Sequence, residues 1–139
     1  IIAHIQKSRI TQYLPRALRI LGQHRSILFQ RDIHALLQSK ISGSFVIEND
    51  PFDVTIYSNL IANFLYNSNL LNIDQKYDCS AALMELLYNA IEHGNCKIGS
   101  AEKKAWLESG KDIMDLIRIK AAQPDVQKKF VCLEYRITP

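Results

Sequence analysis

Apolar residues in the first third of the chain recur at steps of three and four residues, at Leu14, Leu18, Leu21, Ile33, Leu36 and Leu37. This spacing predicts that residues 1–42 are helical. We expect Pro15 to open a second helix, because a first-turn residue needs no N–H partner, and Gly22 is a candidate break. Such helices cannot bury their apolar stripe alone. We therefore interpret residues 1–42 as a helical linker or dimerisation arm.

Beyond residue 42, short β-rich runs alternate with helical stripes. Residues 45–48 are β-rich and end at Asn-Asp-Pro, which predicts a strand closed by a turn. Apolar spacing predicts helices over about 51–70 and 75–93. For the second helix, Asp74 is the expected N-cap and Gly94 the expected C′ residue.

The last third contains a charged helical stretch followed by a strand. Ser100 is expected to cap a helix that ends near Gly110, and a further helix is expected over 112–122. Residues 130–137 alternate and are β-rich, which predicts a strand. The order of elements predicts an α+β two-layer sandwich, with helices on one face of a mixed or antiparallel sheet that is incomplete at the C-terminus.

Composition places the chain among ordinary globular domains. It has 139 residues, of which 47% are hydrophobic and 22% charged, and no apolar run reaches the roughly 18 residues that span a bilayer. The net charge is +3, yet residues 1–42 carry seven basic residues against one acid, Asp32. We interpret this basic segment as a solvated helix face, and we expect neither a membrane nor a nucleic-acid partner.

The three cysteines show no paired or metal-binding spacing. Cys79, Cys96 and Cys132 are scattered and odd in number, which favours free thiols in a reducing, cytoplasmic setting. We expect Cys79 and Cys132 to fill the core and Cys96 to be more exposed.

The helix expected over 75–93 carries the candidate chemistry. Glu85, Asn89 and His93 lie at about 0°, 40° and 80° around its axis, and apolar residues gather on the opposite side, at Leu83, Leu86, Leu87 and Ala90. The Asn89 carbonyl suits Mg²⁺, Glu85 can take a proton from water or a hydroxyl, and His93 can reach a phosphate. Spacing alone is more often that of a solvated face.

Residues 85–95 read Glu-Leu-Leu-Tyr-Asn-Ala-Ile-Glu-His-Gly-Asn. This string resembles the N-box of the histidine-kinase-like (Bergerat-type, GHKL) ATPase superfamily, and the resemblance covers about residues 44–96 and resumes at 130–137. It implies a Bergerat-type ATP-binding fold with ATP and Mg²⁺ as cofactors. It also implies Asn89 as the magnesium ligand, Glu85 as the catalytic base and His93 near the phosphates.

Position 85 indicates the branch of that superfamily. Typical histidine kinases carry Asn where this chain has Glu85, and a Ser hydroxyl or water needs a base whereas a neutral His does not. The chain therefore resembles the anti-sigma-factor serine kinases of bacterial signalling most. This implies Mg-dependent phosphoryl transfer to a sigma-like or anti-anti-sigma-like partner protein, or ATP hydrolysis.

Two departures from the family pattern limit what the resemblance implies. The adenine-binding Asp-x-Gly-x-Gly motif and the ATP lid do not follow residues 130–137, so we expect a truncated site with weak Mg-ATP binding and little catalysis. Residues 97–129 form a helical insert. Two alternatives stay open: a non-catalytic docking or dimerisation module acting through residues 1–42, and a fragment of a sensor histidine kinase.

Overall fold

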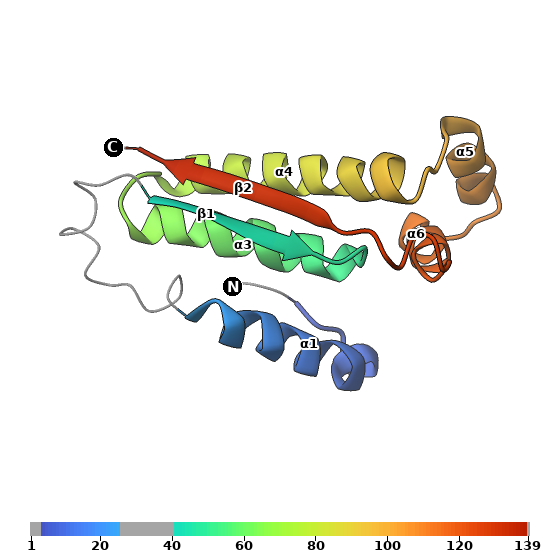
Figure 1. Cartoon of the computed structure of the whole chain (residues 1–139), viewed down its shortest axis with the longest axis horizontal. Helices are drawn as coiled ribbons and strands as arrows, with labels where there is room; N and C mark the ends of the chain where they lie inside the picture. The colour runs from blue at the N-terminus through green and yellow to red at the C-terminus, as the bar shows by residue number, and fades with distance from the viewer. Residues whose placement is uncertain (1–3, 26–40, 139) are drawn as a thin grey trace.

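The computed structural model describes residues 4–25 and 41–138 (Figure 1). These residues form an α+β fold with five α-helices and a two-stranded antiparallel sheet. The sheet runs along one side of a helical layer in which α3 (Pro51–Asn67) lies between α4 (Ile73–Asn89) and α1 (Ile10–Gln23). The helical pattern expected at Ile33, Leu36 and Leu37 lies outside the described residues.

The two strands pair along their full length. β1 (Ile41–Ile47) and β2 (Val131–Ile137) run from Ile41 opposite Ile137 to Ile47 opposite Val131. The expected strand over 130–137 is confirmed to within one residue, while β1 begins four residues before the expected run. Alternate residues of each strand face the helices, as the two-residue period of a strand requires.

A close cross-strand contact explains the glycine in β1. Tyr135 lies opposite Gly43, and its ring stacks on Phe45 with centroids 5.3 Å apart. A Cβ atom at Gly43 would lie 2.6 Å from the Tyr135 hydroxyl oxygen. Any side chain at position 43 therefore forces Tyr135 away from Phe45.

The helices α3 and α4 begin at side-chain caps. Asp50 accepts a hydrogen bond of 2.9 Å from the Phe52 N–H, and Pro51 occupies the first turn of α3. The expected cap of α4 is wrong. Asn72, not Asp74, is the N-cap, because Asn72 and Gln75 exchange two hydrogen bonds of 2.9 Å in a capping box.

The helix α1 packs on α3 as a continuous element. Pro15 lies inside α1 rather than opening a second helix. Buried residues on either side of the proline, Tyr13 and Ile20, hold both halves of α1 on the core. An interior proline costs one helical hydrogen bond, and this packing offsets that loss.

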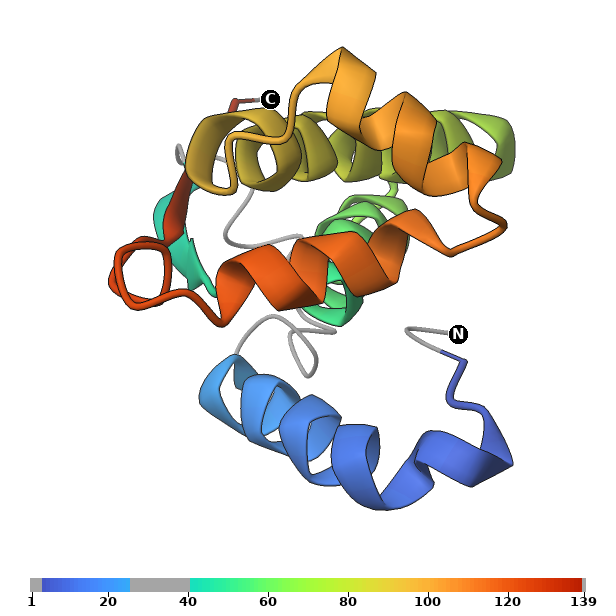
Figure 2. The same cartoon turned by 90° about the vertical axis from the view of Figure 1, so that its right-hand side faces the viewer.

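Beyond α4 the chain continues into a π-helix, Ala90–Asn95, and then two short helices. The expectation that Gly94 ends the helix at a C′ position is wrong, since Gly94 lies within the π-helix and lacks a positive φ. Next come α5 (Ser100–Glu108) and α6 (Ile113–Ala121), which lie near the end of α4 (Figure 2). Gly99 rather than Ser100 is the N-cap of α5.

The cysteines differ from the expectation. Cys96 is buried and Cys132 is exposed, because Cys132 occupies a position on the outward face of β2. Cys79 is half-buried. In the same described residues, no helix is both long and apolar enough to cross a membrane.

Candidate functional site

The three residues expected to carry the chemistry, Glu85, Asn89 and His93, all lie exposed along one helical run and are called the polar stripe below. Glu85 and Asn89 belong to α4, and His93 to the π-helix that continues it. The side chains of Glu85 and Asn89 make no hydrogen bond or ion pair with other residues that the structure describes. Their polar atoms therefore face solvent and are available to a ligand.

The opposite side of this helical run anchors it to the core. Leu87 and Ile91 are 3% and 0% exposed. Leu86 was expected on this buried side, but it is 65% exposed. The reason is geometric: Leu86 lies about 60° around the helix from Asn89, so it borders the exposed polar stripe instead of facing α3.

The stripe ends at the π-helix, where the backbone widens. The Cys96 N–H donates to the Ile91 carbonyl at 2.8 Å, a hydrogen bond over five residues. Single π turns inside helices often occur at functional sites. This one buries Ile91 and Glu92 together and leaves His93 outside.

Glu92, which sequence reasoning did not single out, is buried beside His93. Lys103 of α5 places its Nζ 2.8 Å from Glu92 Oε1 and donates to Oε2 at 3.0 Å. His93 Nδ1 lies 2.9 Å from the Ile98 carbonyl oxygen, and its Nε2 lies 3.4 Å from Glu92 Oε1. The His93 ring is thus oriented by two neighbours. No pattern in the sequence signals the burial of Glu92, because at 100° per residue it falls about 20° from Glu85, on the polar side of the helix.

The Asn-Asp-Pro turn after β1 connects this region to the sheet. The buried Asn49 donates to the carbonyl oxygens of Val126 and Lys129 at 3.1 and 2.7 Å. Its own side-chain oxygen accepts a hydrogen bond of 2.7 Å from Asn95, the last residue of the π-helix. One side chain therefore fixes the end of the polar stripe against the segment that leads into β2.

A hollow of about 400 Å³ opens beside His93. It is lined by residues of the π-helix and of α5, namely His93, Ser100, Lys103, Lys104, Leu107 and Glu108. Basic side chains predominate, and the first turn of α5 reaches the hollow through Ser100. The segment 97–129 therefore contributes directly to the surroundings of His93.

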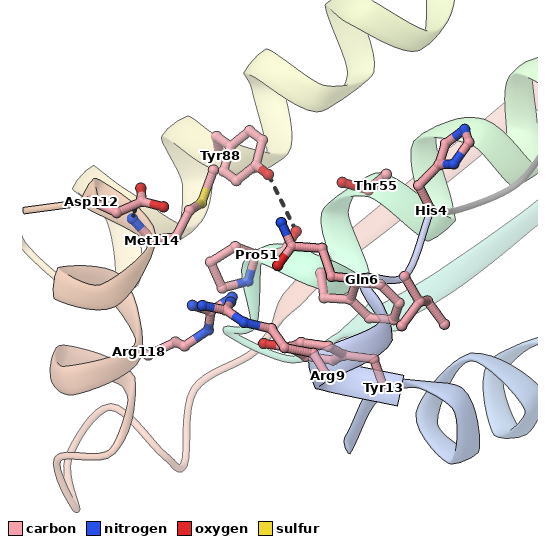
Figure 3. Close-up of a pocket in the computed structure, with 12 residues that line it drawn as sticks. His4, Gln6, Arg9, Tyr13, Pro51, Thr55, Tyr88, Asp112, Met114 and Arg118 are labelled. Carbon is pink, nitrogen blue, oxygen red and sulfur yellow. Dashed lines mark hydrogen bonds between the residues drawn. The ribbon is translucent and has the colours of Figure 1, made fainter. Parts of the chain in front are cut away.

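A second hollow, of about 270 Å³, lies on another side of α4 (Figure 3). Tyr88 of α4 lines it and donates a hydrogen bond of 3.3 Å to the Pro51 carbonyl. The guanidinium carbon of Arg118, in α6, lies 5.8 Å from the centre of the ring of Tyr13, in α1. Burial raises the pKa of Tyr88. None of Glu85, Asn89 and His93 lines this hollow, so it is separate from the polar stripe.

The metal chemistry of the described residues is limited. No three or more His, Cys, Asp or Glu side chains within 4–25 and 41–138 converge on one point. A magnesium site at Asn89 would be of another kind, because Mg²⁺ takes one or two protein ligands and completes its shell with phosphate oxygens and water. The free Asn89 carbonyl oxygen fits that requirement.

Comparisons of the chain with protein families, with curated proteins and with solved structures gave no match. The resemblance to the histidine-kinase-like ATPases therefore rests on the sequence, chiefly on the string at 85–95, and stays a prediction.

Proposed function

We propose that this chain is part of an ATP-binding module of a bacterial signalling protein with a Bergerat-type fold. Its activity would be Mg-dependent phosphoryl transfer to Ser or Thr of a partner protein, or ATP hydrolysis, in the manner of the anti-sigma-factor serine kinases. One observation carries the proposal. Glu85 and Asn89 stand one turn apart on a firmly anchored helix, and both side chains are exposed and unengaged by the described residues.

Each residue of the stripe has a distinct role in this proposal. Asn89 would supply a neutral oxygen ligand to Mg²⁺, which neutralises charge on the transferring phosphoryl group when bound. Glu85 would accept the proton of the attacking hydroxyl or water. His93 would donate from Nε2 to phosphate oxygens only with both ring nitrogens protonated, because Nδ1 then donates to the Ile98 carbonyl. Glu92 Oε1, 3.4 Å from Nε2, faces the same nitrogen.

Calorimetric titration of the 139-residue chain with ATP, with and without Mg²⁺, tests this function. We expect weak binding that requires Mg²⁺ and falls about tenfold in Asn89→Ala, which loses its metal ligand. Asp78→Asn is the matched control, because Asp78 is exposed on the same helix outside the string. Equal affinities in all three proteins, or no binding by the wild type, would contradict the proposal.

A dimerisation module is the second candidate, and the surface of α1 favours it. Ile10, Leu14 and Leu18 are exposed at steps of four residues, which is the spacing of a helix-pairing face. Deleting α1 would not test this, because its other side is buried in the core. Light scattering of Leu14→Gln/Leu18→Gln is the cleaner test. A dimer that the substitutions dissociate supports this candidate, and a monomeric wild type rules it out.

A further inference from the structure

Glu92 requires a permanent cationic partner. Its side chain is only 7% exposed, and an unpaired buried carboxylate is strongly unfavourable. Lys103 meets this need from α5, with its Nζ within 3.0 Å of both carboxylate oxygens. The ion pair therefore fixes both the position of the ammonium group and the docking of α5 on the π-helix.

The Lys103 ammonium stands between this buried carboxylate and the hollow beside His93. An ammonium group has three N–H donors and no acceptor. The Glu92 carboxylate accepts one of them at Oε2. No described residue donates a hydrogen bond to Glu92 Oε1, although this atom lies 2.8 Å from Lys103 Nζ. Lys103 lines the hollow and is 37% exposed, so a donor is left for a group that enters the hollow.

Two further donor groups border the same hollow. The first turn of α5 carries unpaired backbone N–H groups, because its N-cap Gly99 makes no side-chain cap hydrogen bond. Lys104 also lines the hollow, although its Nζ lies 3.9 Å from Glu108 Oε1 and both side chains are largely exposed. A ligand in the hollow would thus meet the fixed Lys103 ammonium, the exposed donor Lys104 and backbone N–H groups, against the single carboxylate of Glu108. Phosphate oxygens suit such a set of donors.

We propose that Lys103, held in place by Glu92, contacts the phosphate chain of the ligand together with the first turn of α5. The segment 97–129 then provides the phosphate end of the site. This inference rests on the proposed function, since it places the phosphates next to His93. Lys103 adds a specificity for the length of the phosphate chain, favouring triphosphates over monophosphates.

The test uses magnesium tripolyphosphate, ATP and AMP as separate probes in calorimetry. Lys103→Met would leave Glu92 buried without a partner, so the informative variant is the neutral pair Glu92→Gln/Lys103→Met. Lys128→Met is the matched control, because it removes an exposed lysine that does not line this hollow.

We expect Glu92→Gln/Lys103→Met to bind tripolyphosphate and ATP about tenfold more weakly, the loss of one charge-assisted hydrogen bond. AMP binding should stay within twofold, as should all binding by Lys128→Met. Unchanged tripolyphosphate affinity in the double variant would overturn the role of Lys103, and an Asn89-dependent ATP affinity would then still leave the proposed function standing. Absence of tripolyphosphate binding by the wild type would overturn the inference as well.

Discussion

Replacing Arg16 with Met should destabilise the protein far more than an ordinary surface substitution. Arg16 joins α1 to α3 through a two-pronged pair with Asp53, with Nε–Oδ1 at 2.6 Å and Nη2–Oδ2 at 2.8 Å. The same guanidinium donates to Glu48 at 2.8 Å. Asp53 is 2% exposed, so removing Arg16 leaves a buried carboxylate with other acids nearby.

The size of the stability loss in Arg16→Met follows from the burial of Asp53. Removing one partner of a buried ion pair costs about 3–5 kcal/mol, and we take about 3 kcal/mol because the Arg16 side chain is 21% exposed. With a urea slope of about 2 kcal/mol per M, the unfolding midpoint should fall by about 1.5 M. Arg19→Met is the control. Arg19 lies on the same helix, 3.6 Å from Glu48, but both side chains are more than half exposed, so we expect a loss below about 0.5 kcal/mol.

The stability deficit of Arg16→Met should depend on pH with a definite sign. Burial raises the pKa of Asp53 above its ordinary value, and Arg16 opposes that rise. Without Arg16 the pKa of Asp53 in the folded state should rise further. A carboxyl group with a raised folded-state pKa contributes stability that is complete below its unfolded pKa and is lost as pH rises through the folded pKa. The deficit of Arg16→Met should therefore be smallest below the ordinary pKa of Asp53 and grow towards neutral pH.

Urea titrations of both variants and the wild type, followed by far-ultraviolet circular dichroism at several pH values, provide the measurement. A loss in Arg16→Met no larger than in Arg19→Met would refute the reasoning. So would a deficit that grows on acidification, because protonated Asp53 no longer needs a cation.

Three further predictions concern other parts of the fold. Gly94→Ala should leave the urea midpoint unchanged or raise stability by about 0.5 kcal/mol, since Gly94 is helical. A loss above about 1 kcal/mol would instead support the original expectation that Gly94 ends the helix in a left-handed conformation. Asn49→Ala should lower the free energy of unfolding by about 2–3 kcal/mol, because three partners lose a hydrogen bond that is buried or partly buried. A neutral result would contradict that role. A thiol reagent should modify Cys132 quickly in the folded protein and Cys96 only on unfolding, since burial raises the pKa of Cys96. Equal rates would contradict the assignment of burial.

Much of the element order follows from local signals. The apolar spacing of α3 and α4 and the alternation of β2 were sufficient to predict these three elements, because each has a continuous pattern over several turns or residues. Glu85 and Asn89 were correctly expected at the surface, since their places on the helix follow from the same pattern. Their chemical roles remain predictions.

Features that depend on tertiary contacts were not predictable in this way. Pro15 was expected to start a helix, but packing of its neighbours on the core keeps it inside α1. Gly94 matched a helix-ending signal, yet the π turn continues past it. Glu92 was missed because its partner, Lys103, comes from another helix. These cases share one cause, since the deciding contact lies far along the chain or on another element.

Paramagnetic broadening by Mn²⁺ provides a direct test of the proposal that Asn89 is a ligand of a nucleotide-bound metal ion. Mn²⁺ would replace Mg²⁺ in a sample of the chain with ATP, and the side-chain amide signals would be followed by NMR. We predict that the Asn89 side-chain amide broadens first, with the backbone signals of α4 around Glu85 next, and that Asn89→Ala loses this local effect. Broadening centred on the acids beside Arg16, or unchanged by Asn89→Ala, would contradict the claim.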